Sequence, residues 1–208
     1  MKQLLFFFSW LVIVTNLSAQ DYKIDTVIKY PNYTSYFSYK LHEPVFVVYK
    51  LYKGGGNCSR DKDRFTDGGL KYSAEPIDYA GNGYDEGHLA NSKDFAYDCK
   101  LQEATFRFFN CVPQTPALNR GCWKVLETKI RQESQKDSLL IICGSLFSDK
   151  AIGKDNIAVP SFCWKIAYKL KDNSLLHSMA FPNNNSQSYK NISVDSIRQY
   201  YPKLSLPF

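Results

Sequence analysis

The chain has 208 residues, of which 44% are hydrophobic and 22% charged, and its formal net charge is +6 at pH 7. This length suits a single domain with a core of its own, and the absence of repeats and low-complexity tracts excludes a fibrous or disordered protein. Lysine and arginine are spread along the chain. Such a surface suits a polyanion such as nucleic acid, although ordinary solubility explains the same charge equally well.

The N-terminal residues have the pattern of a secretory signal peptide. Met1 and Lys2 precede an apolar run from Leu4 to Val14, and small residues follow up to Ala19. A membrane anchor is the alternative, but the run is shorter than the ~20 apolar residues that a spanning helix needs. We therefore expect residues 1–19 to be removed, leaving one domain at 20–208 without a membrane span, exported to the periplasm or outside the cell.

The rest of the chain predicts an α+β fold. Segments rich in β-branched and aromatic residues predict strands at 44–52, 105–112, 138–146, 162–170 and 175–181. Apolar residues at helical spacing, including Leu118, Trp123 and Ile130, predict one long helix over 116–136. A short helix over 195–201 follows, with Ser193 or Asp195 near its cap. We expect one curved, mostly antiparallel sheet with one long helix.

Six cysteines in an exported chain suggest disulfides. They are Cys58, Cys99, Cys111, Cys122, Cys143 and Cys163. Their connectivity stays open, but Cys99 and Cys111 could form one pair that contributes on the order of 3 kcal/mol. No CxxC spacing occurs, which disfavours a zinc cluster.

One histidine stands in a stretch suited to catalysis, GYDEGHLANSKDF from Gly83 to Phe95. A neutral imidazole with a pKa near ~6.5, such as that of His88, can take a proton from water. Asn119 offers an oxygen of the kind that Mg²⁺ prefers. Glu127, eight residues on, is turned by about 80° around a helix and can face the same cleft. This combination suits phosphodiester hydrolysis.

The motifs resemble a known enzyme family. YDEGH followed by TFRFFNCVPQTPALNRGCWKVLE is similar to the active-site segment of the DNA/RNA non-specific endonucleases, the ββα-metal nucleases that include sugar-non-specific nucleases and endonuclease G. Upstream, VVYKL and SRDKDRFTDGG resemble further family segments, and so do AIGKDNIAVPSFCWKIAYKL and ISVDSIRQYYPKL downstream. The resemblance spans most of the mature chain and implies the ββα-metal fold.

The resemblance implies a role for each matching residue. His88 is the general base, Asn119 the direct ligand of Mg²⁺ (or Mn²⁺), and Glu127 a catalytic residue that holds a water on the metal. Each has a structural alternative: His88 as a core histidine, Asn119 as a helix cap, and Glu127 paired with Lys124 or Arg131 on a solvated face. Trp123 is expected in the core, and Asp85 in a structural role.

Arginines and one acid are expected along the substrate path. Arg60 matches the family's phosphate-stabilising arginine by its spacing to Phe65, with Arg64 as its rival, and Arg120 contacts substrate or shapes the cleft. Glu86 stands where the family usually has arginine. It should share a face with His88 near bound phosphate. We expect it to form an ion pair with Arg60, Arg64 or Arg120 rather than to hold hydrated metal.

These features together predict an exported, Mg²⁺-dependent, sugar-non-specific endonuclease acting on DNA and/or RNA. The alternatives are a non-catalytic exported protein that binds nucleic acid or another partner on the same scaffold, and a disulfide-stabilised surface domain. The sequence leaves open the preference for DNA or RNA and the oligomeric state.

Overall fold

A seven-stranded sheet forms the centre of the computed structural model, which describes residues 22–201. Its strands, in spatial order, are β1 (Thr26–Lys29), β2 (Thr34–Ser38), β3 (Glu43–Leu51), β6 (Leu139–Ile152), β7 (Ile157–Lys169), β8 (Leu175–Pro182) and β9 (Lys190–Asn191). Every neighbouring pair is antiparallel, as expected. The expected signal peptide, residues 1–19, lies outside the described residues.

Four of the five predicted strands are confirmed as β3, β6, β7 and β8, but the prediction for 105–112 is wrong over most of its length. A 3-10 helix occupies Phe108–Asn110, and the strand β5 covers only Cys111–Gln114. The Asn110 side chain explains the difference, because its amide nitrogen donates to the Thr105 carbonyl at 2.9 Å and to the Ala90 carbonyl at 3.0 Å. These bonds fold the segment into a turn that a strand cannot follow.

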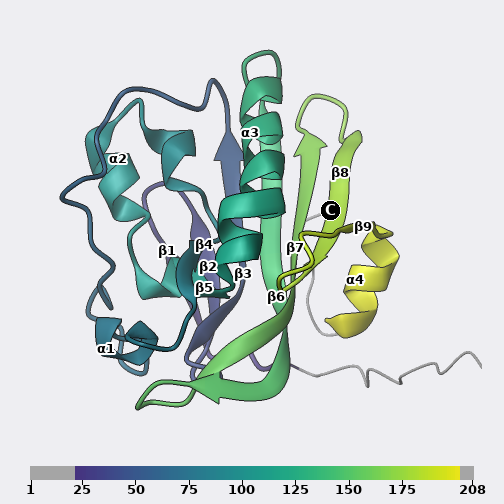
Figure 1. Ribbon diagram of the computed structural model, residues 1–208. Helices are drawn as coiled ribbons and strands as arrows, with labels where there is room; N and C mark the ends of the chain where they lie inside the picture. Colours follow the sequence, from purple (N-terminus) through teal and green to yellow (C-terminus); the bar gives the residue numbers. More distant parts are fainter. Residues whose placement is uncertain (1–21, 202–208) are drawn as a thin grey trace, which may run out of the picture.

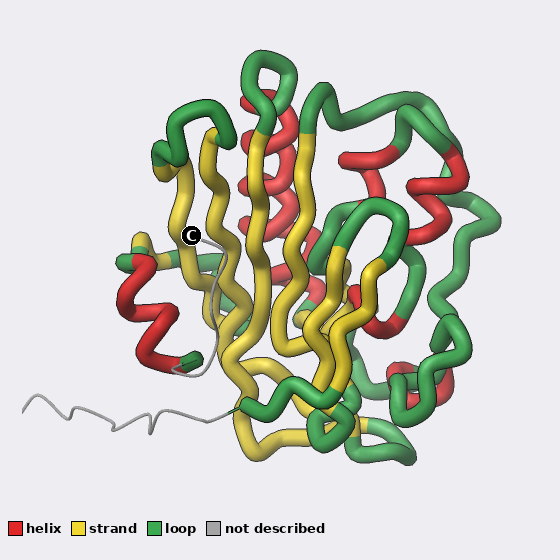
Figure 2. Tube along the Cα trace, turned by 180° about the vertical axis from the view of Figure 1, so that it is seen from behind, coloured by secondary structure: helices red, strands yellow, loops and turns green. Residues whose placement is uncertain are grey.

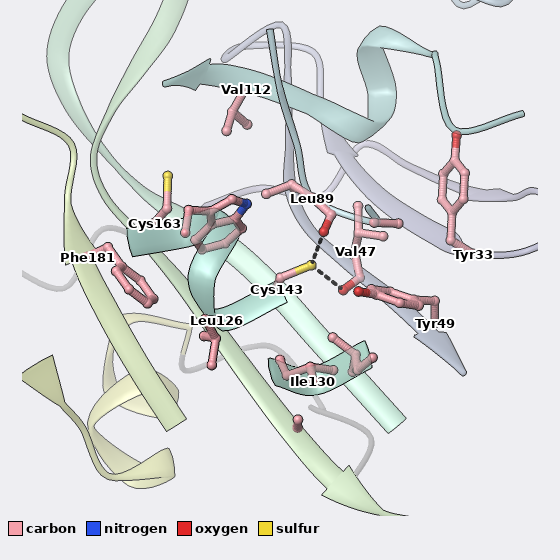
Figure 3. Close-up of a cluster of buried hydrophobic side chains, with 14 of the residues drawn as sticks. Tyr33, Val47, Tyr49, Leu89, Val112, Leu126, Ile130, Cys143, Cys163 and Phe181 are labelled. Atoms are coloured by element: carbon pink, nitrogen blue, oxygen red, sulfur yellow. Dashed lines mark hydrogen bonds between the residues drawn. The ribbon is translucent and has the colours of Figure 1, made fainter. Parts of the chain in front are cut away.

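One long helix lies across one face of the sheet, and the C-terminal helix lies beside its β8–β9 edge (Figure 1; Figure 2). On one face, α3 (Lys124–Glu133) buries Leu126 and Ile130 against the sheet residue Cys143, in the cluster drawn in Figure 3. On the other, α4 (Val194–Tyr200) buries Ile197 beside Trp164. The Ser193 side chain caps α4 by accepting from the amide of Ser196, which confirms the predicted cap.

A second, two-stranded sheet precedes α3. β4 (Asp85–His88) pairs antiparallel with β5, and a π-helix, Leu118–Trp123, leads from β5 into α3. The predicted helix over 116–136 is therefore interrupted, because Gly121 adopts the non-helical angles φ −102° and ψ −118°. The order β4, β5, α3 is the ββα unit that the resemblance implied. Two short helices belong to this part of the chain: α1 (Pro76–Tyr79) precedes β4, and α2 (Cys99–Ala104) lies between β4 and β5 in the sequence.

The cysteines pair differently from the expectation. The only disulfide in the described part of the chain joins Cys58 to Cys99, with Cα atoms 5.3 Å apart, and the other four cysteines are free. The suggested Cys99–Cys111 pair is wrong, because Cys111 points into the interior from β5, where its sulfur lies 3.3 Å from the Tyr79 hydroxyl. Cys99 instead begins α2 at the surface.

Candidate active site

His88 ends β4 and lies at the wall of a cleft. The residue is only 8% exposed, and its ring packs against Phe65 and Phe106, with ring centroids 4.6 and 4.7 Å away. Its Nε2 atom has no hydrogen-bond partner among the described residues. Burial lowers the pKa of His88 well below its ordinary value of 6.5, and the positive charges of Arg60 and Lys165 lower it further. The imidazole is therefore neutral at pH 7.

The glycine before His88 lets β4 approach its neighbour closely. A Cβ atom on Gly87 would come within 2.4 Å of the Gln114 side chain, which is buried in β5. Any other residue would displace this buried side chain. The glycine of the DEGH motif thus leaves the space that the Gln114 side chain occupies.

Asn119 lies inside the π-helix, so the alternative of a helix cap is wrong. Its side-chain nitrogen donates to Asp85 at 2.9 Å, and Arg120 clamps the same carboxylate with two bonds of 2.8 and 2.6 Å. Burial opposes ionisation of Asp85, but these hydrogen bonds outweigh it and lower the Asp85 pKa. Asp85 thereby orients the Asn119 amide. The other amide atom, the Asn119 oxygen, accepts no hydrogen bond from the described residues and remains available to a ligand.

Glu127 is also buried, with 5% exposed, and does not pair with Lys124 or Arg131 as the structural alternative supposed. One carboxylate oxygen accepts from Lys165 Nζ at 3.2 Å, and the other accepts from the side chain of Asn91. A carboxylate has about four acceptor positions, so each oxygen can still accept a further bond.

Sequence reasoning missed Lys165. It is fully buried in β7, donates to the Leu89 carbonyl at 3.1 Å, and lies 4.3 Å from the Trp123 ring centroid. Trp123 is itself in the core, as predicted. A lysine in the middle of the otherwise apolar segment FCWKIAYKL was the signal that could have found it, because a lysine is almost never fully buried without a partner.

The two candidate arginines lie at different places. Arg60 lines the cleft of about 370 Å³ that also contains His88, Asn119 and Glu127, and its guanidinium lies 5.4 Å above the Phe106 ring. Arg64 lines only an adjoining outer cleft of about 750 Å³ and donates to the Asp61 and Asp63 carbonyls. Arg60, Glu86, Asn119 and Arg120 line both clefts. Both clefts thus meet at these four residues.

The expected ion pair of Glu86 is wrong. Within residues 22–201 no lysine or arginine forms a salt bridge with it, because Asp85 has taken Arg120 and Arg64 is bonded to backbone carbonyls. Burial raises the pKa of Glu86, the neighbouring Asp85 raises it further, and Arg64 opposes them only weakly. Glu86 is therefore a half-buried acid on the wall where the two clefts meet.

The residues of the inner cleft fit a magnesium ion by their chemistry. No three His, Cys, Asp or Glu side chains gather into a metal-binding group in the described chain. Mg²⁺ instead is usually held by one or two protein oxygens together with waters and substrate phosphate. The free oxygen of Asn119 and the carboxylate of Glu127 are such groups and face one cleft.

A hairpin and a helix that bring a neutral histidine, an available amide oxygen and a buried carboxylate to one cleft define a ββα-metal nuclease. Residues 14–202 match the DNA/RNA non-specific endonuclease family, and the chain belongs to it. A chain in the crystal structure of the EndoG/EndoGI complex has the same fold, with a TM-score of 0.76 at 22% identity over 86% of this chain and 84% of that one.

Curated relatives share part of the chain. A nuclease of Nostoc sp. is 40% identical over 96 residues, which are 46% of this chain and 35% of the relative. Human mitochondrial endonuclease G is 32% identical over 108 residues, 46% of this chain and 36% of the relative. Bovine mitochondrial endonuclease G is 31% identical over 128 residues, which are 55% of this chain and 43% of the relative. These matches span about two fifths of the relatives or less.

No helix within residues 22–201 has both the length and the apolar character that crossing a membrane requires.

Proposed function

We propose that this protein is an exported, Mg²⁺-dependent endonuclease that hydrolyses phosphodiester bonds in DNA and/or RNA. The observation that carries the proposal is the unpartnered Nε2 atom of the buried His88 beside a cleft shared with Asn119 and Arg60. A buried polar atom without a partner is costly in a native protein and often marks a functional site. The family supports nucleic acid as the substrate.

The chain's own residues account for most of the reaction. The neutral imidazole of His88 removes a proton from water, which attacks the phosphorus in line with the leaving 3′ oxygen. Burial keeps the base neutral at pH 7. Arg60 offers a planar set of donors to the phosphate oxygens. Arg120 is fixed by Asp85, so its main effect is to hold the wall that orients Asn119.

Asn119 would hold the metal directly, and Glu127 would act through water beside it. When bound, the cation supplies positive charge at the phosphate and at the leaving oxygen. Lys165 and Asn91 hold the Glu127 carboxylate in one orientation. Orienting bonds of this kind commonly tune a metal site.

Export is supported by the signal-peptide pattern at residues 1–19 and by the Cys58–Cys99 disulfide, since disulfides persist mainly in oxidising compartments. Expression of the full chain with its leader tests this part. Edman sequencing of the processed protein should begin at Gln20, and a product that stays unprocessed inside the cell would contradict export.

The activity is tested with purified residues 20–208 on plasmid DNA, single-stranded DNA and RNA, each with Mg²⁺ or with EDTA. We expect cleavage of all three with Mg²⁺ only, and none by His88→Ala. Glu86 favours one alternative, a non-catalytic exported protein that binds another partner on the same scaffold, because an unpaired acid on the cleft wall weakens phosphate binding. A wild type that neither binds nor cleaves nucleic acid would support that alternative.

A further inference from the structure

We propose that the Cys58–Cys99 disulfide holds Arg60 in the active-site cleft, and that its reduction by a dithiol lowers activity. The proposal rests on the function proposed for Arg60 at the substrate phosphate. It assigns to the disulfide a positioning role in the reaction, in addition to its effect on stability.

The chain that carries Arg60 is tied down on both sides of it. Before the disulfide, the Gly55 amide donates to Asp94 at 3.2 Å and the Cys58 amide donates to Ala96 at 3.1 Å. After the exposed stretch, Phe65 is buried and the Thr66 amide donates to Phe106 at 3.3 Å. The ends of the loop are therefore part of the folded body.

Between these ties, residues 59–64 are mostly exposed and bond mainly to one another. The Asp63 amide donates to the Arg60 carbonyl at 3.0 Å, and Ser59 bonds to Asp61 at 2.7 Å. Among residues 22–201, the polar link from this loop outward is Gln102, whose amide nitrogen, in the orientation that satisfies both its atoms, lies 3.3 Å from the Cys58 and Ser59 carbonyls. Gln102 belongs to α2, the helix that Cys99 begins. The disulfide and the Gln102 contacts therefore both connect the loop to α2.

The Arg60 side chain does not anchor the loop by itself. It forms no salt bridge in the described chain, and its only ring contact there is with Phe106, at 5.4 Å. Phe106 in turn lies 4.7 Å from the His88 ring. The position of Arg60 relative to His88 thus depends on the backbone, and the nearest covalent tie is the disulfide two residues earlier.

A dithiol can reach this bond. Cys99 is exposed and Cys58 is half-buried, whereas Cys111, Cys143 and Cys163 are buried thiols that reduction does not change. Reduction breaks the single sulfur–sulfur bond and leaves a thiol on each cysteine, while the dithiol is oxidised to its own disulfide, with two electrons and two protons transferred. The covalent tie across 41 positions of the sequence is then lost.

The test compares the oxidised protein, the protein reduced with dithiothreitol, and the double variant Cys58→Ser/Cys99→Ser. At 25 °C, below the unfolding transition of each form, we expect reduction to lower kcat/KM on a short DNA duplex at least fivefold. The loss should be smaller than the ~10² to 10³-fold caused by complete removal of one positioned donor, because reduction loosens Arg60 without removing it. The double variant should match the reduced protein and not respond to dithiothreitol, and reoxidation should restore the wild type. Should the double variant fail to fold, reversible reduction alone decides the outcome.

Two further measurements separate positioning from general destabilisation. Trypsin should cut after Arg60 and Arg64 faster in the reduced protein, and Arg60→Ala should remove most of the effect of reduction on kcat/KM, since effects through one residue are not additive. Cys122→Ser is the matched control and should remain as sensitive to dithiothreitol as the wild type. Unchanged kcat/KM on reduction, or an equal loss in Arg60→Ala, would overturn the proposal. No cleavage by the oxidised protein would instead refute the proposed function.

Discussion

The buried pair of Lys165 and Glu127 allows a quantitative prediction. Lys165→Met keeps most of the side-chain volume but removes the charge that faces Glu127 Oε1 at 3.2 Å. Burial alone would lower the pKa of Lys165, yet the attraction of Glu127, assisted by Cys143 and Asp94, outweighs it and raises that pKa. The variant therefore leaves a carboxylate in the interior whose remaining described partner is Asn91.

The expected loss is large. Removing one partner from a buried ion pair commonly costs about 3–5 kcal/mol, because the other charge stays desolvated. In the variant, burial raises the pKa of Glu127 without Lys165 to oppose it. A raised folded-state pKa means that the stability is present below the unfolded value, ~4.3 for a glutamate, and is lost as pH rises through the folded value. The deficit relative to the wild type should therefore be greatest at pH 7 and smaller at pH 5.

Urea denaturation followed by tryptophan fluorescence measures this loss at both pH values. Lys169→Met is the matched control, because it lies on the same strand and pairs with Asp137 at 3.0 Å near the surface. Exposed pairs contribute little, so the control should unfold nearly as the wild type does. The expected minimum loss is ~3 kcal/mol, so a free energy of unfolding of Lys165→Met within about 1 kcal/mol of the wild-type value would refute the reasoning. An equal deficit at both pH values would refute it as well.

Three further predictions concern the cleft. His88→Ala should lower kcat at least ~10²-fold on plasmid DNA, as expected for a lost general base, and near-normal turnover would remove the mechanism. Because the pKa of His88 lies below 6.5, wild-type kcat/KM should stay high as pH falls to 6.5. Arg60→Ala should shift the acidic fall of kcat/KM to higher pH, because the positive charge of Arg60 lowers the His88 pKa. A wild-type profile that already falls above pH 7 would speak against a neutral buried base. Glu86→Gln should lower KM for DNA, since one negative charge leaves the cleft wall, while the Mg²⁺ concentration for half-maximal rate stays unchanged; a large increase in that concentration would show that Glu86 serves the metal.

Local sequence patterns determined most of the fold. Alternating β-branched and aromatic residues identify β3, β6, β7 and β8, and helical spacing identifies α3, because these patterns depend on neighbours two to four residues apart. The same reasoning fails at 105–112, where Asn110 bonds back to Thr105 and Ala90. A side chain that competes for backbone groups overrides the strand propensity of its neighbours.

The motif likewise identified the ββα unit and named His88, Asn119 and Glu127, whose roles stay predictions. The sequence could not say which charges would meet. Lys165 and Glu127 are 38 positions apart, and Asp85 and Arg120 are 35 apart. Their meeting depends on how the strands and α3 pack.

Only the tertiary structure decided that Asp85 rather than Glu86 would hold Arg120, that Arg60 rather than Arg64 would share a cleft with His88, and that Cys99 would pair with Cys58. The two acids and the two arginines are near neighbours of the same chemical type in the sequence. Several cysteines were equally able to pair with Cys99. The chain path then chose between them, because hydrogen bonds, ion pairs and disulfides form only within a few ångströms. Residue type determines which partners are possible, and packing determines which of them is within reach.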